Sequence, residues 1–409
     1  MTPGSRCLSS HLCYARASLP AVVIVCAGLL LAANPAAGQA FTVLHAFSVE
    51  QSEQPSAGLA IDGSGALYGT TTYTNAGGED GQAFKMKQHG SGWLFTPLSN
   101  FPILGNIDPR GPLLVAPDGA LFGTLYFNYG CEFCGGVFQL YPPPTVPRTV
   151  LQLWNGQTLH DFSGGSDGGN PSGALLRDQS GNLFGTTENG GIGLGTIYKL
   201  DHDTWNETVV FAPQGPTDGV MPLNGVISDD AGNLYGVFEV GGPNGAGVVY
   251  ELSNSGNGWT EQHVYDFSGG SDGAEPVSVV MDASGNLYGA TSGGGTNHAG
   301  TMFKLTRSSG GWSLTTLYNF SGSAPCGVTG RLTLSNGGLY GTTRCDGAYG
   351  YGSIFGLTSS GYQDLHDFTN GDDGSYPNGD LVVDKQGNLY GTTFGGGSGG
   401  GGVVFEITP

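Results

Sequence analysis

Apolar and polar positions alternate along this chain in short units that return at a regular interval. One unit contains the apolar triplet Val279-Val280-Met281, a polar turn, and the run Leu287-Tyr288-Gly289-Ala290-Thr291. The core of that run, Leu followed by an aromatic residue and Gly, occurs seven times. Its copies begin at Leu67, Leu121, Leu183, Leu234, Leu287, Leu339 and Leu389. Short apolar runs bounded by turn residues predict β-strands, and the chain shows no helical periodicity.

A polar turn joins the apolar triplet to the core in every repeat. In its fullest form the turn reads Asp-x-x-Gly-Asn, and its fourth position is Gly in all seven copies. Asp occupies the first position in five copies: Asp62, Asp178, Asp229, Asp282 and Asp384. An Asp side chain can cap such a turn, and Gly can adopt the left-handed conformation that ends it. The pattern therefore predicts a β-hairpin.

Two further strands complete each repeat. A Gly-rich loop leads into a third strand such as 301–305, and a fourth strand such as 312–320 opens on Trp and closes on Phe. Successive cores start 54, 62, 51, 53, 52 and 50 residues apart. Four short strands in about 52 residues are typical of one propeller blade, whereas stacked solenoid coils have shorter repeats. The sequence predicts an all-β fold, a seven-bladed β-propeller of four-stranded blades.

The two ends of the repeat array are predicted to meet in one blade. The seventh repeat reaches Pro409 after its third strand, and the segment 41–47 matches fourth strands such as 365–368. We therefore expect an N-terminal strand over 41–47 to complete the last blade and close the ring. Within each core, Leu and the aromatic residue point to opposite faces of the strand. This predicts a sheet packed between two blades, with the core Gly letting the facing sheet approach closely.

The first forty residues have the pattern of a signal peptide. Arg6 and Arg16 precede the apolar run 19–31, and small residues follow through Gly38 and Ala40. This pattern predicts cleavage near Gly38 or Ala40, with a retained membrane anchor as the alternative. A lipoprotein attached through Cys26 is a weaker alternative, because Val25 is bulky where a small residue is expected. The predicted organisation is a signal peptide over 1–40 and a single propeller domain over 41–409. No later apolar run has the length of a membrane span, so we expect none in the mature chain.

Composition narrows the possible partners. The chain has 76 Gly, 13 Lys and Arg, and 33 Asp and Glu, which gives a formal net charge of −20. The predicted leader contains two arginines and no acids, so the mature chain has a net charge of −22 (−20 minus 2). Such an acidic surface repels phosphate backbones, which argues against nucleic acid as a partner.

Four of the seven cysteines lie after the predicted leader. An even number of cysteines in an oxidising compartment favours disulfides. We predict a local bond between Cys131 and Cys134, because a zinc site would need two more ligands nearby. We predict a second bond between Cys326 and Cys345, which flank the first two strands of the sixth repeat on the same face. Free thiols are the alternative for this second pair.

Four aspartates recur in the loops that lead into the first strand of a repeat. Each stands four residues before Pro and is followed by Gly, and they are Asp167, Asp218, Asp272 and Asp373. If these loops converge at the mouth of the central channel, their carboxylates are candidates for ligand binding and for calcium coordination. The alternative is that each Asp only caps its own bend.

A shared position near the end of the fourth strand holds His45, His160 and His366, and Tyr265 and Tyr318 occupy it elsewhere. A position that accepts either ring is typical of packing. No catalytic triad, metalloprotease motif or phosphate-binding loop is present, and the Gly-rich runs lie between strands, unlike dinucleotide-binding loops.

The ordered series of these motifs resembles the GloVer tandem repeat of exported "choice-of-anchor" proteins. The segments 178–200 and 265–291 are near-complete matches, and the resemblance covers essentially all of 41–409. It implies an exported, propeller-like protein that is often attached to the cell surface. It implies no particular reaction and no catalytic residues.

Two functions fit the sequence. One is an exported, non-catalytic binding or scaffold protein that contacts an extracellular glycan, a protein or a surface component through loops on one face. The other is a propeller enzyme that acts on extracellular polysaccharide through loop carboxylates at the channel mouth. The repeats carry similar acids in many blades, and the two deviant blades gain cysteines and prolines, which favours binding. We expect a monomer that is secreted, extracellular or periplasmic, with cell-surface association as a further possibility.

Overall fold

The computed structural model describes residues 39–49, 54–72, 81–100, 108–127, 131, 133–143, 154–256, 258–322 and 327–408. Contacts divide the chain into Met1–Ala37 and Gly38–Pro409, and every described residue belongs to the second unit. The predicted signal peptide, apart from its last two residues, lies outside the described residues, as does Cys326.

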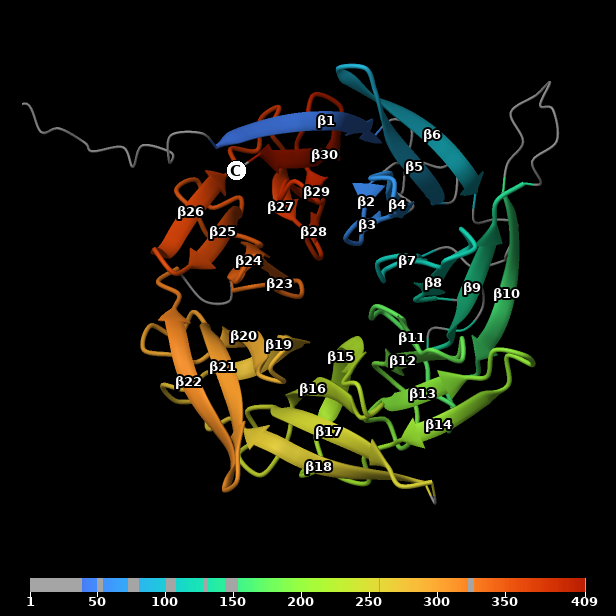
Figure 1. Cartoon of the computed structure of the whole chain (residues 1–409), viewed down its shortest axis with the longest axis vertical. Coiled ribbons are helices and arrows are strands. Elements are labelled where there is room, and N and C mark those ends of the chain that lie inside the picture. Colours follow the sequence, from blue (N-terminus) through green and yellow to red (C-terminus); the bar gives the residue numbers. More distant parts are fainter. Residues whose placement is uncertain are drawn as a thin grey trace, which may run out of the picture. The chain divides into compact units, whose positions relative to one another are not determined.

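The described residues form seven antiparallel sheets, which are the blades of the propeller (Figure 1). Blade 1 consists of β2 (Gln54–Pro55), β3 (Ala60–Ile61), β4 (Leu67–Thr72), β5 (Gln82–His89) and β6 (Gly92–Asn100). Blade 2 consists of β7 (Leu114–Val115), β8 (Leu121–Leu125), β9 (Gly135–Tyr141) and β10 (Asn155–Phe162). Blade 3 consists of β11 (Leu176–Arg177), β12 (Leu183–Thr187), β13 (Thr196–Leu200) and β14 (Glu207–Phe211).

The remaining blades repeat the same order. Blade 4 consists of β15 (Val220–Ser228), β16 (Leu234–Val240), β17 (Val248–Asn254) and β18 (Trp259–Asp266). Blade 5 consists of β19 (Ala274–Met281), β20 (Leu287–Gly293), β21 (Thr301–Ser308) and β22 (Gly311–Asn319). Blade 6 consists of β23 (Thr333–Ser335), β24 (Gly338–Thr343), β25 (Ser353–Thr358) and β26 (Gly361–Asp367). Blade 7 consists of β27 (Ser375–Pro377), β28 (Val382–Val383), β29 (Leu389–Gly395), β30 (Gly400–Thr408) and β1 (Ala40–Ser48). Within the described ranges, no helix has the length and apolar character needed to cross a membrane.

The N-terminal strand closes the ring, as predicted. In Figure 1 the blue strand β1 lies beside the dark-red β30. The two strands are antiparallel, with Phe41 opposite Ile407 and Val43 opposite Phe405. Phe47 is fully buried in a cluster that joins blades 7 and 1. The seven-bladed propeller is therefore completed by β1, the first strand of the described residues.

The predicted hairpin turn is stabilised by its Asp side chain. One carboxylate oxygen of Asp282 accepts the backbone N–H groups of Ser284 and Asn286, both at 2.9 Å. The other accepts the Asn286 amide at 2.8 Å and the Tyr288 hydroxyl at 3.1 Å. The turn Gly has positive φ in all seven copies: Gly65, Gly119, Gly181, Gly232, Gly285, Gly337 and Gly387. The core Tyr thus also fastens the turn that precedes it.

Blade 6 lacks the capping Asp because its turn is of another type. Ser335 pairs with Gly338, which leaves two residues between the strands. Those residues, Asn336 and Gly337, have φ of 49° and 76°. Positive φ at both central residues of a two-residue hairpin is typical of a type I′ turn. The shorter turn is therefore formed by Asn336 and Gly337 alone and does not need an Asp cap.

The paired Leu and aromatic side chains of the core fill the seams between blades, as predicted. Seven buried clusters each join two consecutive blades. In the seam between blades 4 and 5, Tyr235 of one core packs in the same cluster as Leu287 of the next. The same pairing closes the ring, where Tyr390 of blade 7 shares a cluster with Leu67 of blade 1. One dipeptide per repeat therefore contributes to both neighbouring seams.

The core Gly has a different role from the one predicted. A Cβ at Gly289 would strike the ring of Phe303, and the equivalent Gly of every other blade faces an aromatic ring in the same way. Phe303 lies directly opposite Gly289 on the third strand of the same blade. The space above the Gly is therefore taken by its own cross-strand partner, and the facing sheet is not the neighbour that requires it. An aromatic ring lying across a cross-strand Gly shields that backbone and fixes the pairing register.

Aromatic side chains of the fourth strands seal the outer part of each seam. All five tryptophans contact the core aromatic residue of the preceding blade, in the pairs Trp93–Tyr390, Trp154–Tyr68, Trp205–Phe122, Trp259–Phe184 and Trp312–Tyr235. The ring of His45 stacks on Phe95 at 4.3 Å, and the ring of His366 stacks on Phe41 at 3.9 Å. The shared His or Tyr position therefore serves packing between blades.

Candidate functional site

Strand pairing places three positions of each repeat together at the inner end of its blade. In blade 1, Pro55 pairs with Thr71, the last residue of the core, and Gln54 pairs with Thr72. Pro222 and Pro377 pair with the corresponding core residues of blades 4 and 7. The residue before this Pro, the residue after it, and the residue after the core therefore meet at one edge. We call these three the mouth positions.

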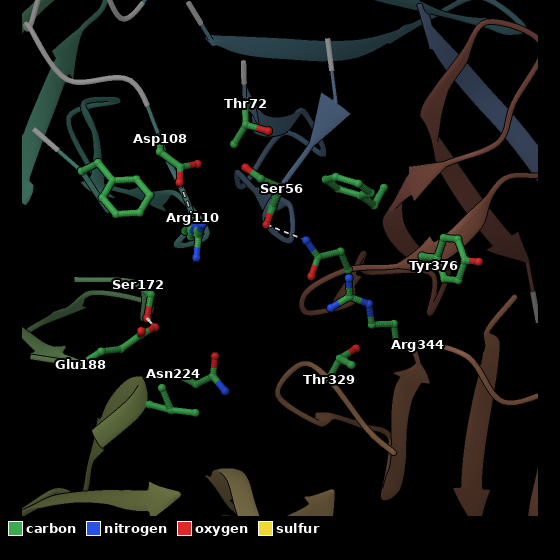
Figure 2. Close-up of a pocket in the computed structure, with 14 residues that line it drawn as sticks. Ser56, Thr72, Asp108, Arg110, Ser172, Glu188, Asn224, Thr329, Arg344 and Tyr376 are labelled. Atoms are coloured by element: carbon green, nitrogen blue, oxygen red, sulfur yellow. Dashed lines mark hydrogen bonds and ion pairs between the residues drawn. The ribbon is translucent and has the colours of Figure 1, made fainter. Parts of the chain in front are cut away.

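The mouth positions surround a pocket of about 640 Å³ at one end of the central channel (Figure 2). Its lining residues are Ser56, Thr72, Asp108, Arg110, Phe127, Ser172, Glu188, Leu223, Asn224, Thr329, Arg344, Tyr376, Asn378 and Phe394. Twelve of these fourteen occupy mouth positions, counting Thr329, where Val328 replaces Pro, and the other two are the neighbours Phe127 and Asn224. Six blades contribute, and blade 5 does not. The pocket is thus built from repeated positions with different side chains.

Farther along the channel, the wall becomes apolar. A second cavity of about 440 Å³ is lined by residues of the innermost strands, including Leu59, Leu113 and Leu332. One ion pair interrupts this wall, because Nε of Arg331 donates to the Asp380 carboxylate at 2.8 Å. The polar groups available to a soluble ligand are therefore concentrated at the mouth.

Arg110 is held firmly in the mouth pocket. Its Nε donates to an oxygen of Asp108 at 2.9 Å, and its guanidinium carbon lies 3.9 Å from the centre of the Tyr126 ring. The side chain is 44% exposed, and Figure 2 shows its terminal nitrogens turned toward the open pocket. Among the described residues, no partner binds those two nitrogens. Burial raises the pKa of Asp108, although the neighbouring Arg110 opposes this effect.

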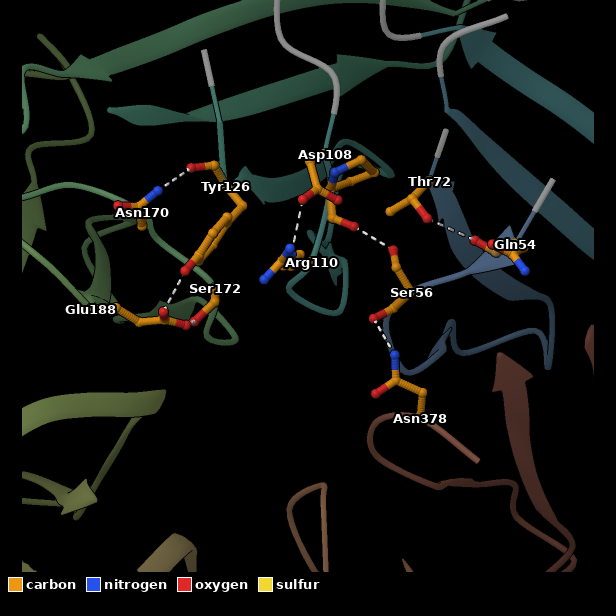
Figure 3. A network of polar contacts seen from close by, with 11 residues as sticks. Gln54, Ser56, Thr72, Asp108, Arg110, Tyr126, Asn170, Ser172, Glu188 and Asn378 are labelled. Carbon is orange, nitrogen blue, oxygen red and sulfur yellow. Dashed lines mark hydrogen bonds and ion pairs between the residues drawn. The ribbon is translucent and has the colours of Figure 1, made fainter. Parts of the chain in front are cut away.

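Tyr126 is itself fixed by a chain of hydrogen bonds that crosses from blade 2 to blade 3 (Figure 3). Its hydroxyl donates to Glu188 at 2.6 Å, and the second oxygen of Glu188 accepts the Ser172 hydroxyl at 2.7 Å. The amide of Asn170 donates to the Tyr126 carbonyl at 2.9 Å. Burial, and then the bond to Glu188, raises the pKa of Tyr126, so the phenol stays a neutral donor. Both oxygens of Glu188 are consequently occupied.

Other mouth side chains lock neighbouring blades together. The Asn378 amide donates to the Ser56 carbonyl at 2.8 Å across the closure between blades 7 and 1, and the Ser56 hydroxyl donates to the Pro109 carbonyl at 2.5 Å. In the same way, the Asn224 amide reaches the Val277 carbonyl at 2.8 Å. These contacts fix the backbone of the mouth, so the pocket is rigid before any ligand arrives.

The residue before the entry Pro is strained in four blades. Asn170, Met221, Glu275 and Tyr376 have φ between 54° and 57°, which is uncommon for residues other than Gly. The N–H of Tyr376 donates to the Tyr351 carbonyl of the preceding blade at 2.7 Å, and Glu275 makes the equivalent bond to Ala246. These bonds between blades offset the strain. Strained backbone of this kind is common where side chains must be aimed at a ligand.

Charge is unevenly distributed around the mouth. Glu188, Glu239 and Glu275 come from mouth positions of blades 3, 4 and 5, whereas Arg110 and Arg344 come from blades 2 and 6. Burial is the main cause that raises the pKa of Glu239, and the charges of Glu275 and Glu188 add to it. No described residue donates a hydrogen bond to the Glu239 carboxylate. One side of the ring is therefore acidic, and arginines stand at both ends of that arc.

The structure does not bring the four loop aspartates together, and none of them lines the pocket. Each binds its own loop: Asp272 accepts the Ser268 N–H at 2.8 Å, and Asp373 accepts the Thr369 N–H at 2.9 Å. Asp167 and Asp218 make the equivalent backbone bond within their own loops, both at 2.8 Å. Burial alone would raise the pKa of Asp272, but its hydrogen bonds, chiefly from Ser268, lower it overall. Within the described ranges, no group of three or more His, Cys, Asp or Glu is placed to hold a metal ion. Calcium at these aspartates stays a prediction.

A disulfide joins Cys131 and Cys134 in the loop between β8 and β9, with their Cα atoms 5.4 Å apart. Cys345 is also disulfide-bonded. Its predicted partner, Cys326, lies outside the described residues.

The sequence carries a signal for the mouth positions that no repeated motif reveals. The residue after the core differs between repeats although the core barely changes. In order, these residues are Thr72, Tyr126, Glu188, Glu239, Ser292, Arg344 and Phe394. We call the repeated turn, core and strand pairing of each blade the frame. A position that changes from repeat to repeat beside this frame is one whose side chain the fold does not require.

Seven four-stranded blades define a seven-bladed β-propeller, and a polar pocket lies at the mouth of its channel. The chain belongs to the Gloeobacter/Verrucomicrobia repeat family, whose model matches residues 147–332 and 313–409. This finding confirms the resemblance given by the repeat motifs. No protein of curated function matches the chain in sequence.

Solved propellers share the fold at low sequence identity. The puromycin hydrolase structure has a TM-score of 0.58 at 11% identity and covers 84% of this chain and 50% of its own. The extracellular domain of a one-component system from B. thetaiotaomicron has a TM-score of 0.51 at 14% identity, over 87% of this chain and 39% of that one. PorZ, a surface component of the type-IX secretion system of Porphyromonas gingivalis, also has a TM-score of 0.51 at 14% identity, over 85% and 46%. This chain therefore spans half or less of the length of these three proteins.

Proposed function

We propose that this protein is an exported, non-catalytic binding protein that holds a glycan in the mouth pocket. The observation that carries the proposal is the contrast between a repeated frame and a pocket whose lining differs in each blade. A volume of about 640 Å³ is within the range of small-molecule sites and accommodates a short oligosaccharide. The pocket combines hydroxyl and amide groups with the rings of Phe127, Tyr376 and Phe394, which suits the polar edges and apolar faces of sugars.

Several features support an extracellular location. A disulfide is present between Cys131 and Cys134, and such bonds persist mainly in oxidising compartments. The leader over 1–40 has the pattern of a signal peptide, and the strongly acidic composition agrees with a soluble exported chain. We propose that residues 41–409 act as a single monomeric propeller domain. Association with the cell surface would follow from the glycan that the mouth binds.

A propeller enzyme acting on polysaccharide is the second candidate, because Glu239 has the raised pKa that suits a general acid. Such a mechanism needs a second, available carboxylate as base or nucleophile. Of the two acids beside Glu239, Glu188 accepts two hydroxyl donors and Glu275 accepts the Ser292 hydroxyl. These contacts make binding without turnover the stronger proposal.

The proposal is tested by binding of residues 41–409 to an array of extracellular oligosaccharides. Phe394 is 36% exposed in the mouth, so Phe394→Ala should weaken binding at least about tenfold by removing a stacking surface. Tyr349→Ala is the matched control, because Tyr349 is an exposed aromatic residue that does not line the pocket, and its binding should stay within about twofold.

The same samples decide between binding and catalysis. Bound oligosaccharides should be recovered intact, with no new reducing ends after long incubation. Release of reducing ends that disappears in Glu239→Gln would establish the enzyme instead. Equal loss of binding in both aromatic variants would place the ligand outside the mouth.

A further inference from the structure

The mouth pocket contains two of the few cationic side chains of this chain, and Asp108 and Glu188 also line it. The sequence contains 13 Lys and Arg against 33 Asp and Glu, and two of these cations belong to the predicted leader. Of the remaining eleven (13 minus 2), two arginines line one pocket, Arg110 and Arg344. Both come from the deviant blades 2 and 6, at positions that hold uncharged or acidic residues in other repeats.

Arg110 presents a defined face to a ligand. Its Nε is used by Asp108, and one face of its guanidinium lies on the Tyr126 ring. The terminal nitrogens remain, and they point into the pocket (Figure 2). A guanidinium offers two parallel N–H groups from its terminal edge, which match the two oxygens of a carboxylate. The anchored side chain therefore offers a pair of parallel donors to an oxyanion such as a carboxylate.

The support behind Arg110 makes this site pre-organised. Tyr126 carries the guanidinium and is fixed by Glu188, which is in turn held by Ser172 (Figure 3). Ordering a long Arg side chain on binding would otherwise oppose the association. Because Arg110 is already fixed before binding, less of the free energy of its hydrogen bonds to a ligand is offset by lost side-chain entropy.

Arg344 reaches into the same pocket from the other side (Figure 2). It follows the core of blade 6 and is exposed. No hydrogen bond or ion pair engages its guanidinium among the described residues. An unpaired Arg beside a pocket, in a chain with a large surplus of acids, is consistent with a charge that is reserved for a ligand.

From these contacts we infer that the ligand is an acidic oligosaccharide whose uronate carboxylate binds Arg110, with Arg344 providing the second positive charge. This inference rests on the proposed function and names the glycan class. A singly charged carboxylate suits the pocket better than a phosphate, because Asp108 and Glu188 line it and Glu239 occupies a neighbouring mouth position, and these acids repel a dianion more strongly. The rings of Tyr376 and Phe394 lie on the same rim, where the sugar faces can pack.

The test compares a uronate oligosaccharide with its carboxyl-reduced form, which has the same linkages and ring stereochemistry but no charge. Calorimetry on residues 41–409 should show at least tenfold tighter binding of the uronate form. Arg344→Ala should remove most of this preference while leaving the melting temperature unchanged, because no hydrogen bond or ion pair with a described residue engages its guanidinium. Arg110→Lys keeps the charge but loses the paired donors, and it should lower uronate affinity about tenfold.

The control variant is Arg307→Ala, since Arg307 lies against Trp312 on the outer side of blade 5 and should not affect the preference. Equal binding of the two oligosaccharides at the mouth would overturn the uronate inference and leave glycan binding standing. Tighter binding of a sulfated or phosphorylated oligosaccharide, or of a peptide with a free C-terminal carboxylate, would also overturn it. Failure of every oligosaccharide to bind would remove the proposed function itself.

Discussion

The last residue of each core and the residue that follows it belong to two different regions of this molecule. Thr291 is fully buried, and its hydroxyl bonds both the Thr301 hydroxyl at 3.0 Å and the Thr301 N–H at 2.9 Å. Ser292, one position later, lies outside this buried network. In blade 6 the same step leads from buried Thr343 to exposed Arg344. The frame therefore ends at the last core residue, and the side chain of the next residue varies between blades.

The loop aspartates and the mouth residues show the same contrast over five positions. Asp373 accepts the N–H of Thr369 and is hydrogen-bonded to Nε2 of His366, and it closes a bend between an outer and an inner strand. Asn378 lies five residues later and lines the pocket. Both belong to one connection, but only the second reaches the channel. A repeated acid in a repeated loop is therefore better explained by the loop than by a ligand.

The largest test of the frame is removal of β1. A chain that starts at Val49 lacks the strand that pairs with β30 and loses Phe47 from the seam between blades 7 and 1. Truncating one buried Phe costs roughly 3–5 kcal/mol, so loss of the whole strand should cost more than about 5 kcal/mol. Denaturant unfolding measures the effect. Thr42→Ala, on the exposed side of β1, should stay within about 0.5 kcal/mol of the parent chain. An unchanged unfolding midpoint after the deletion would contradict ring closure.

Two glycines of β20 test where the frame ends. In Gly289→Ala the new Cβ would meet the Phe303 ring and lie 2.5 Å from the Ser278 carbonyl oxygen. Overpacking of this kind should lower the free energy of unfolding by about 3 kcal/mol. In Gly293→Ala the new Cβ would lie 3.3 Å from the flexible Glu275 carboxylate, and the change should stay within about 0.5 kcal/mol. Similar costs at both positions would show that the frame extends to the end of the strand.

Much of the frame could be predicted from the sequence because its physics is local and is repeated seven times. Residues close together in the sequence show the role of the turn Asp and Gly and of the Leu and aromatic pair. The repeat pattern likewise shows that the seventh repeat needs a fourth strand from elsewhere. The role of the core Gly was predicted wrongly for the same reason. Its neighbour is Phe303, fourteen residues ahead, and only the pairing register shows that the two lie opposite each other.

The site was harder to predict because no single repeat contains it. The support of Arg110 comes from Asp108 beside it, from Tyr126 sixteen residues later, and from Glu188 in the next blade. Such a network exists only after the blades pack side by side. Motifs consist of residues that repeat, whereas the pocket is lined by residues that change from one repeat to the next.

Two substitutions separate the loop from the mouth. Asp373→Ala removes an acceptor from the Thr369 N–H and should cost about 1 kcal/mol of stability, while oligosaccharide affinity stays within about twofold. Arg344→Ala should do the reverse, with stability within about 0.5 kcal/mol and affinity lowered at least about tenfold. Thermal unfolding and calorimetry on the same samples measure both quantities. If Asp373→Ala instead abolished binding without changing stability, the loop aspartates would be ligand residues after all.

The smallest effect expected is a difference in pH response between the frame and the mouth. Burial alone would raise the pKa of Asp282, but hydrogen bonds from Asn286, Ser284 and Tyr288 lower it overall. Its stabilising contribution is therefore complete above the unfolded pKa of about 3.9 and is lost only as the pH falls below that value.

The pKa of Glu239 is shifted in the opposite direction, because burial and the charges of Glu275 and Glu188 raise it above the usual value of about 4.3. As the pH falls from 7 to 5, protonation is expected at Glu239 before it is expected at Asp282, and a uronate, with a pKa of roughly 3.5, remains charged at both pH values. Loss of that repulsion should tighten uronate binding about twofold to fivefold, as calorimetry at the two pH values would show. Glu239→Gln should bind with the tighter affinity at both pH values, and an equal pH response in that variant would place the titrating group elsewhere.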